Sequence, residues 1–429
     1  MPGHVRARGK RKDGTTIWQA RWRPADDTSD ARRRESNHKT KREAERRVTR
    51  MDSDVLRGAY ADPRKGEVAL SVLAGDLRET WTNLEPKTRA GYEAILSRWI
   101  IGDRDPIHPS RPCRFARVKV AAVNAETVQR FVNEIGAVRA PNTVRRVFGV
   151  LNSLMRLAVQ PGYVATNACD AVKLPTKKRA GVRRSHLYLE GPELRTLAEA
   201  MPEHYRVATY VAGSCGLRAG ELWALRRRDI DLLHGELTVR YALKEINSSA
   251  ASMTNDKELM VGPPKSAASR RRLSIPSGLT PTLGAMVEGT GVRAPGGYAV
   301  ARAVNEDPAD LHWTDDPSDP DRLLFVTPRG YPVRHNMFYK RVFRPVVTAT
   351  LPARLQALRW HDLRHTCAAL SLAANPSLAL VKERLGHENI TTTVDLYGKR
   401  VPSVDAALAD AVGGAIFAAP KVVPLRLAE

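Results

Sequence analysis

The feature that most constrains this 429-residue chain is an amphipathic stripe near residue 150. Apolar residues recur there at the i, i+3, i+4 and i+7 positions that form one face of a helix. The stripe consists of Val144, Val147, Phe148, Leu151, Leu154, Met155 and Ala158. We therefore predict a helix with one buried face, capped by Asn142-Thr143 and carrying Arg145 and Arg146 away from the buried side.

The length of the chain favours two or three domains over a single one. Residues 60–67 contain Asp62-Pro63 and Gly66, which is typical of a linker, and residues 175–184 form a second, basic linker. The predicted domains are residues 1–60, a small domain with a sheet and one helix; residues 68–174, a helical domain; residues 185–412, a domain with helices and a small sheet; and a tail, residues 413–429.

The first 60 residues predict a three-stranded sheet and one helix. Strands are expected at residues 5–8, 16–23 and 32–36. Trp18, Ala20 and Trp22 alternate along the second strand, so one face of the sheet should be apolar. Thr40 and Glu43 have the spacing of a capping box, which predicts a helix reaching about residue 56.

The composition indicates a polyanionic partner. Lys and Arg number 69 against 46 Asp and Glu, a formal net charge of +23, which favours DNA or RNA over a merely basic protein. The residues predicted to contact DNA are Arg21, Arg23, Lys41, Arg145, Arg146, Lys177 and Lys178. The alternative for each is a solvated basic surface. The hydrophobic fraction of 42% is sufficient for real cores.

The cysteines and the apolar runs indicate a compartment. Cys113, Cys169, Cys215 and Cys367 include no CxxC pair, which argues against a zinc ribbon and favours free thiols in a reducing environment. The sequence has neither a secretory signal pattern nor a run of 18 apolar residues. We therefore expect a cytoplasmic protein.

Residues 185–412 predict a mostly helical domain with a small sheet. Strands are expected at residues 237–241 and 271–275, joined by a long polar connection at residues 247–264. Residues 289–321 are rich in Gly, Pro and Asp and predict a mobile surface insertion.

Residues that suit phosphoryl transfer occur in order along this second half. They are Gly216-Leu217-Arg218-Ala219-Gly220-Glu221-Leu222, Pro264-Lys265-Ser266, His361-Asp362-Leu363-Arg364-His365-Thr366, Leu385-Gly386-His387 and Tyr397. A guanidinium matches phosphate oxygens with two parallel donors, and a phenol can attack phosphorus. The pairs His361/Arg364 and Arg218/Glu221 are each three residues apart, so each pair would share a helix face. Alone, any of these residues would more often be structural, but the ordered set predicts metal-free phosphoryl transfer on nucleic acid.

These motifs, together with Thr391-Thr392-Thr393-Val394-Asp395-Leu396-Tyr397, resemble those of the tyrosine recombinase (phage integrase) family. The resemblance is strong over residues 185–400. The N-terminal segment resembles the arm-binding domain of integrases of phages and integrative elements, and residues 68–171 resemble their helical, SAM-like core-binding domain. The implied fold is multidomain and mainly α, with a small N-terminal three-stranded sheet plus helix and a mixed α+β catalytic domain.

The resemblance also implies a role for each matching residue. The implied catalytic residues are Arg218, Lys265, His361, Arg364, His387 and Tyr397. Tyr397 would be the nucleophile, forming a 3′-phosphotyrosyl link and freeing a 5′-hydroxyl. The two arginines would clamp the phosphate, His387 would hydrogen bond to it, and His361 would assist proton transfer from the tyrosine. Lys265 would be the general acid, Glu221 would support an arginine, and His365 would be a structural neighbour.

Partners and alternatives follow from the same resemblance. It implies a homotetramer on double-stranded DNA attachment sites, no cofactor or metal, no membrane, and a directionality factor or host DNA-bending protein as an optional partner. A chromosome-dimer-resolving recombinase, a type IB topoisomerase and a DNA-binding regulator with a decayed site are the alternatives. The first typically lacks an arm-binding domain, the second uses related chemistry, and the third would bind DNA without forming a covalent intermediate.

Overall fold

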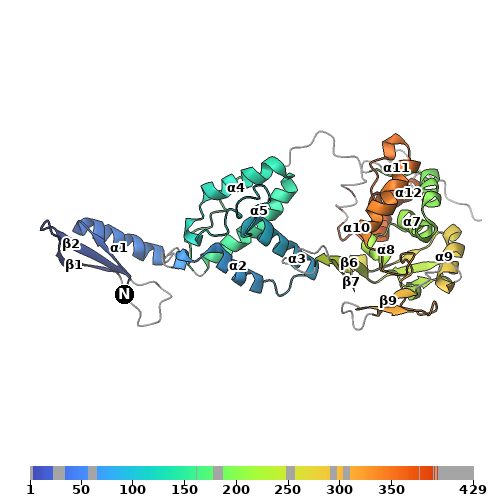
Figure 1. Cartoon of the computed structure of the whole chain (residues 1–429), viewed down its shortest axis with the longest axis horizontal. Helices are drawn as coiled ribbons and strands as arrows, with labels where there is room; N and C mark the ends of the chain where they lie inside the picture. Colours follow the sequence, from blue (N-terminus) through green and yellow to red (C-terminus); the bar gives the residue numbers. More distant parts are fainter. Residues whose placement is uncertain are drawn as a thin grey trace, which may run out of the picture. The chain divides into compact units, whose positions relative to one another are not determined.

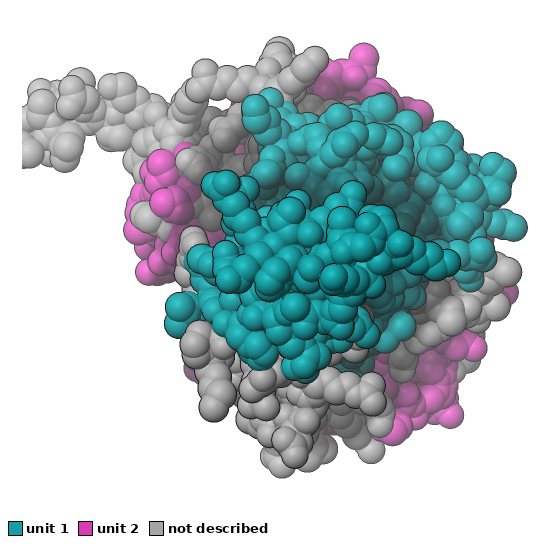
Figure 2. Space-filling view, turned by 90° about the vertical axis from the view of Figure 1, so that its left-hand side faces the viewer, with its two compact units in different colours: residues 1–183, 247–256 teal, residues 184–246, 257–429 magenta. Residues whose placement is uncertain are grey.

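A computed structural model of the chain describes residues 3–22, 34–56, 65–160, 162–176, 187–247, 257–289, 297–302, 310–375 and 377–389, with Thr391 and Val394. The chain divides into two compact units, coloured separately in Figure 2. The first unit comprises residues 1–183 and 247–256, and the second comprises residues 184–246 and 257–429.

The first unit begins with the predicted sheet and helix. Strands β1 (His4–Lys10), β2 (Thr16–Trp22) and β3 (Arg34–His38) pair antiparallel in that order, and α1 (Lys41–Leu56) contacts all three. Ala20 and Trp22 of β2 are buried against α1, as the alternation predicted. The capping box is present, because Glu43 N donates to Thr40 Oγ1 (3.2 Å) and Thr40 N donates to a Glu43 carboxylate oxygen (3.3 Å).

The rest of the first unit is helical and has a separate core. Its helices are α2 (Leu70–Glu79), α3 (Pro86–Ile95), which continues as a π-helical turn (Leu96–Ile100), α4 (Ala125–Val138) and α5 (Pro141–Val159). The predicted stripe lies on α5 and is buried, except that Phe148 is only partly covered. The predicted cap is wrong: α5 begins at Pro141 after Ala140, so Asn142-Thr143 lies inside the first turn. Proline suits this start because it lacks the N–H that a cap would satisfy.

The second unit combines helices (Figure 1) with small sheets, three of them among its described residues. Its helices are α6 (Gly191–Ala200), α7 (Glu203–Cys215), α8 (Ala219–Trp223), α9 (Thr280–Glu288), α10 (His335–Phe338), α11 (Arg344–Thr350), α12 (Asp362–Ala374) and α13 (Leu378–Leu385), with a π-helical turn at Tyr339–Phe343. Figure 1 shows α12 and α7, far apart in sequence, side by side.

The two predicted strands of this unit are confirmed as neighbours in one sheet. Strands β4 (Ile230–Asp231), β5 (Glu236–Val239) and β8 (Arg271–Ser274) pair antiparallel in the order β4-β5-β8. Leu237 lies opposite Leu273, and Val239 lies opposite Arg271. Leu237, Leu273 and Val239 are buried, so the side chain of Arg271 points to the covered face of the sheet.

Two segments differ from the prediction. The connection predicted at residues 247–264 contains part of a further hairpin, β6 (Ala242–Asn247) with β7 (Lys257–Gly262). The segment predicted to be a mobile surface insertion contains β9 (Tyr298–Arg302) paired with β10 (Asp310–Thr314). Tyr298, Ala299, Val300 and Ala301 are buried, because this short apolar run packs into the core and Ala299 O accepts from Leu323 N (2.8 Å).

Within the described ranges, no helix is both long and apolar enough to cross a membrane. All four cysteines are free and buried. Cys215 and Cys367 lie among core residues, as predicted.

Candidate active site

The C-terminal end of α13 is bound by three arginines from three different parts of the second unit. They donate to three successive backbone carbonyls: Arg271 Nε to Arg384 (2.8 Å), Arg364 Nη2 to Leu385, and Arg218 Nη2 to Gly386 (3.2 Å). The last carbonyls of a helix lack partners within the helix and carry its negative end, so guanidinium groups suit them. The next residue along the chain is His387. We call Arg218, Arg271 and Arg364 the three-arginine cluster.

Glycine is required where α13 ends. Gly386 has a φ of +63°, in the left-handed region. A Cβ at this position would lie 2.8 Å from the carbonyl oxygen of Ala268 and 3.1 Å from Cδ of Arg271. The chain can therefore turn from α13 to His387 beside the cluster only without a side chain at residue 386.

Arg218 is held by a buried carboxylate and a buried hydroxyl. It immediately precedes α8, and its Nη1 donates to Glu221 Oε1 (2.6 Å) and to Ser269 Oγ (2.9 Å). The backbone N–H of Arg218 also donates to the other Glu221 oxygen (3.0 Å). The Arg218 side chain remains 31% exposed, whereas that of Glu221 is 2% exposed. The predicted i, i+3 pair thus forms, with the arginine open to a ligand and the carboxylate behind it.

Glu221 serves two arginines at once. Its second oxygen accepts from Arg271 Nη2 at 3.1 Å. Burial by itself would raise the pKa of Glu221, but the charges of Arg271 and then Arg218 outweigh burial and lower that pKa below its usual value. The carboxylate is therefore ionised and balances part of the positive charge of the cluster.

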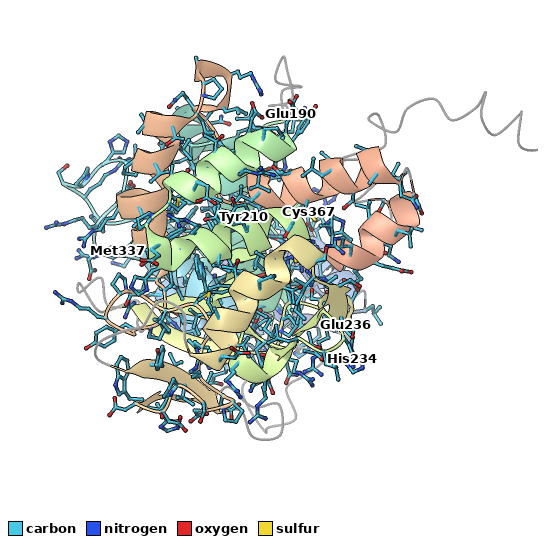
Figure 3. All side chains as sticks on the ribbon, turned by 90° about the vertical axis from the view of Figure 1, so that its right-hand side faces the viewer. Glu190, Tyr210, His234, Glu236, Met337 and Cys367 are labelled. Carbon is cyan, nitrogen blue, oxygen red and sulfur yellow. The ribbon has the colours of Figure 1, made fainter. Side chains whose placement is uncertain are left out.

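Arg364 lies on α12 and is buried. Besides its bond to Leu385, its Nη1 donates to the carbonyl of Gly216 at 2.7 Å. Gly216 ends α7 with a φ of +68°, and a Cβ there would lie 2.7 Å from Leu385 and 2.9 Å from Cys367 Sγ. Cys367 of α12, labelled in Figure 3, also donates from Sγ to the carbonyl of Ser214 (3.2 Å). These contacts bring the ends of α7 and α13 to the same face of α12.

Two histidines accompany the arginines. His387 is buried, and burial, followed by the nearby charges of Arg364 and Arg218, lowers its pKa to about 4. His361 immediately precedes α12 and is exposed to solvent. Although the residue is exposed, the protein atoms packed around it, followed by the charge of Arg364, lower the pKa of His361 to about 4 as well. The pKa values of both histidines are lowered, so both imidazoles are uncharged near neutral pH.

His365 lies beside this pair. It is buried on α12, and its ring meets that of His361 edge to face, with the centroids 5.2 Å apart.

The structure describes Lys265 but not four other predicted site residues. Lys265 follows β7, and its side chain is exposed. Tyr397, Arg23, Lys177 and Lys178 lie outside the described residues. Within the described ranges, no group of three or more His, Cys, Asp or Glu side chains is arranged to hold a metal ion.

The predicted DNA-contacting residues of the first unit differ in how open they are. Lys41 and Arg146 are exposed. Arg145 donates to the carbonyl of Pro175 at 2.7 Å, which uses part of its guanidinium within the protein. Arg21 forms an ion pair with Glu35 at 3.4 Å. Lys41 also pairs with Glu45 (3.7 Å), but its side chain remains 61% exposed compared with 23% for Arg21, so Lys41 and Arg146 are the better placed of these four to meet a ligand.

Sequence reasoning gave no role to two residues of the site, Arg271 and Ser269. The signal for Arg271 was present, because Arg271, Arg272 and Leu273 alternate along a strand whose leucine is buried. That alternation places Arg271 on the covered face and Arg272 on the open face. The role of Ser269 depends on Arg218, which is 51 residues away, and no local pattern predicts such a contact.

Known proteins resemble this chain over most of its length. The phage integrase family model matches residues 300–401. A tyrosine recombinase XerC-like protein of Caldanaerobacter subterraneus subsp. tengcongensis is 24% identical over 380 residues, covering 86% of this chain and 88% of the relative. A putative prophage phiRv2 integrase of Mycobacterium tuberculosis is 28% identical over 318 residues, covering 73% of this chain and 71% of the relative.

A solved structure shows the same fold. The Tn1549 transposon integrase, in complex with a circular intermediate DNA, matches with a TM-score of 0.57 at 16% identity, covering 80% of this chain and 98% of the other. The fold, the family match and the relatives agree with the motifs that surround the three-arginine cluster. By the family match over residues 300–401 and by its relatives, the chain is similar to the tyrosine recombinases of the phage integrase family.

Proposed function

We propose that this protein is a site-specific DNA recombinase, an integrase that cuts and rejoins DNA strands through a 3′-phosphotyrosyl intermediate to integrate or excise a mobile element. The observation that carries the proposal is the placement of Arg218 and Arg364 at the end of α13, directly before His387. Two guanidinium groups and an uncharged imidazole in one place suit a phosphodiester whose oxygens gain charge during transfer.

Arg218 retains donors for such a phosphate. Among the described residues, its Nη1 serves Glu221 and Ser269, and its Nη2 serves Gly386 once. The Nε hydrogen and the second Nη2 hydrogen remain for a ligand. Because Glu221 and Ser269 hold the other side of the guanidinium, the plane of the fork is set before DNA binds, and little reorganisation is needed at the moment of reaction.

The histidines act as neutral hydrogen-bonding groups in this proposal. With its pKa lowered to about 4, His387 meets the phosphate as an uncharged imidazole that donates one N–H. His361 is also uncharged and accepts the proton of the attacking phenol. A bound phosphate brings negative charge next to both rings and raises their pKa values, which favours this proton uptake.

The covalent step that we propose requires only residues of the protein and the DNA. The Oη of Tyr397 forms a bond to phosphorus while the bond from phosphorus to the 5′-oxygen breaks, and Lys265 supplies the proton to that leaving oxygen. Rejoining is the reverse attack by a 5′-hydroxyl of the partner strand. The phosphodiester energy is kept in the phosphotyrosyl link, so no ATP is consumed.

We also propose a separate function for each domain of the chain. Residues 1–60 bind arm-type DNA, residues 68–174 bind the core site, residues 185–412 carry the chemistry, and residues 413–429 form a tail. Exposed Lys41 and Arg146 contact phosphates. The working form is a cytoplasmic homotetramer on two double-stranded attachment sites, with a directionality factor or a host DNA-bending protein as an optional partner.

The proposal is tested by incubating the purified protein in EDTA with DNA that flanks its own gene. SDS-resistant protein–DNA complexes at a discrete site are expected with the wild type, and Tyr397→Phe should bind the same DNA without forming them. Covalent complexes formed by Tyr397→Phe would contradict the assignment of the nucleophile. Tight binding without any adduct by the wild type would favour a DNA-binding regulator.

Two further outcomes separate the related enzymes. One of the relatives is a XerC-like recombinase, and a chromosome-dimer-resolving recombinase remains the alternative. Full recombination by a chain lacking residues 1–60 would favour that alternative, whereas loss of recombination with retained cleavage supports an integrase. Relaxation of plasmid without any special site would point to a topoisomerase.

A further inference from the structure

We propose that Arg271 is a positioning residue for strand cleavage, which holds in place the groups that orient Arg218 and His387 without itself touching the DNA. This inference rests on the function proposed above. It concerns how the site is held together.

Among the described residues, each polar contact of the Arg271 side chain leads to a group that supports the site. Its Nη2 donates to Glu221 (3.1 Å), its Nη1 donates to the carbonyl of Ser269 (2.9 Å), and its Nε donates to the carbonyl of Arg384 (2.8 Å). The guanidinium fork therefore joins two distant segments, at Glu221 and Arg384, to the turn that directly precedes its own strand. Its rigid plane fixes their spacing in a way that a flexible ammonium group would not.

Two of these partners also hold Arg218. The Glu221 carboxylate accepts from Arg218 through one oxygen and from Arg271 through the other. Ser269 accepts from Arg218 at its hydroxyl and from Arg271 at its carbonyl. Arg271 thus braces both groups that set the plane of the Arg218 guanidinium.

The third partner places His387. Arg384 lies in the last turn of α13, three residues before His387, and its carbonyl is bound by Arg271. Gly386 between them packs closely on the Arg271 side chain, where an added Cβ would lie 3.1 Å from Cδ. Moving Arg271 therefore moves the turn that carries His387.

The position of Arg271 explains why it acts through other residues. It lies on the covered face of β8, and its side chain is 7% exposed, compared with 31% for Arg218. A phosphate can approach Arg218, but it cannot reach Arg271 without displacing protein groups. Its charge also keeps Glu221 ionised, because Arg271 is the charge that lowers the pKa of that carboxylate most.

The neighbouring arginine provides a matched control. Arg272 lies on the opposite face of the same strand, its side chain is 68% exposed, and it pairs with Glu236 at 3.3 Å. Glu236 is labelled at the edge of the unit in Figure 3, in a different part of the view from Cys367. Arg272→Met removes the same charge and the same side-chain type from β8 without affecting the cluster.

The experiment compares Arg271→Met, Arg271→Lys and Arg272→Met in the full chain, with the DNA that gives adducts with the wild type. We measure the single-turnover rate of adduct formation, the Kd for the same DNA and the thermal midpoint of each variant. Arg271→Met should slow cleavage about a hundredfold, the size expected when catalytic groups are misplaced by about 1 Å. Its Kd should stay within about threefold of the wild type, because Arg271 does not contact DNA. Arg272→Met should cleave at the wild-type rate.

Two further readouts distinguish positioning from a loss of folding. Arg271→Lys keeps the charge beside Glu221 and should recover part of the rate, even if Arg271→Met is too unstable to measure. Because Glu221 loses its strongest cationic neighbour, the acid limb of the rate–pH profile of Arg271→Met should move to higher pH. Combining Arg271→Met with Glu221→Gln should cost less than the product of the single effects, since both act on Arg218.

The inference is overturned if Arg271→Met cleaves at the wild-type rate, or if its rate loss equals its loss of DNA binding. Equal rates for Arg271→Lys and Arg271→Met, with an unmoved pH profile, would also overturn it. Failure of the proposed function looks different, because then the wild-type protein itself gives no adduct.

Discussion

Oε1 of Glu221 lies 2.6 Å from Nη1 of Arg218, and the carboxylate is almost completely buried behind the arginine. Breaking a buried ion pair by removing one partner commonly costs about 3–5 kcal/mol, because the remaining charge is left uncompensated. The contact therefore has a value for stability as well as a proposed role in orienting the phosphate clamp.

Glu221→Gln should lower both stability and cleavage. The amide oxygen can still accept from one arginine, but the amide NH₂ then faces the other arginine, so one donor meets another donor. We expect a loss of roughly 2–4 kcal/mol in unfolding free energy and a strong loss of adduct formation. Thermal unfolding and single-turnover cleavage measure the two effects. Glu236→Gln, which affects the pair between half-buried Glu236 and exposed Arg272, should change stability by less than about 0.5 kcal/mol. Equal losses in both variants would refute this account.

Gly386→Ala tests the turn that leads to His387. Alanine is strained at a φ of +63°, and its Cβ would also collide with the carbonyl of Ala268. Gly235→Ala is a matched control, because Gly235 has a φ of +65° but nothing within 4 Å of the added Cβ. The control should lose about 1–2 kcal/mol from backbone strain alone. Gly386→Ala should lose more than the control and should also slow cleavage, as measured by thermal unfolding and adduct formation. A Gly386→Ala protein that resembles the control in both measurements would show that the turn tolerates a side chain.

The pH dependence of stability should report His387. Its pKa is lowered from 6.5 to about 4 in the folded chain, mainly by burial, so the unfolded chain binds the proton more readily. The resulting penalty is absent above about pH 6.5, grows as the pH falls, and is complete near pH 4, where it amounts to at most about 3 kcal/mol. The thermal midpoint of His387→Gln should therefore fall less than that of the wild type between about pH 7 and about pH 4.5.

The control is His108→Gln, which removes an exposed histidine. Its thermal midpoint should fall as much as that of the wild type. Parallel curves for all three proteins would show that His387 does not titrate in this way.

Sequence patterns were sufficient to predict the elements that depend on contacts between residues close together in the sequence. The periodicity of α5, the alternation along β2 and the Thr40–Glu43 capping box each involve residues within a few positions of one another, and each is present in the structure. The motifs likewise identified Arg218, Arg364 and His387, which the structure brings to the end of α13.

The predictions failed where they were based on amino-acid composition alone, and where a residue's role depends on contacts with residues far away in the sequence. Gly, Pro and Asp are frequent in the region of β9 and β10 and obscured the short apolar run at residues 298–301, which is buried and is bound through Ala299 by the more distant Leu323. Arg271 gained its role from Glu221 and Arg384, which are 50 and 113 residues away. A sequence pattern shows that Arg271 points inward, but only the fold shows which groups it meets there.

The N-terminal sheet and helix provide a last test, independent of the catalytic chemistry. Its buried core consists of few residues, among them Ala20, Trp22 and Val48, so the loss of one helix cap should be measurable. Thr40→Ala removes the hydroxyl that accepts from Glu43 N and should cost about 1 kcal/mol.

Thr49→Ala is the matched control: Thr49 lies inside the same helix, where its hydroxyl only donates back to the carbonyl of Glu45, and alanine is the better helix former there. Hydrogen exchange of peptides from α1 in the full chain should therefore speed up in Thr40→Ala and remain unchanged or slow down in Thr49→Ala. If arm binding belongs to this segment, Thr40→Ala should also weaken DNA binding at elevated temperature while cleavage at the core site continues. Unchanged exchange in Thr40→Ala would show that the capping box contributes little to holding α1 on the sheet.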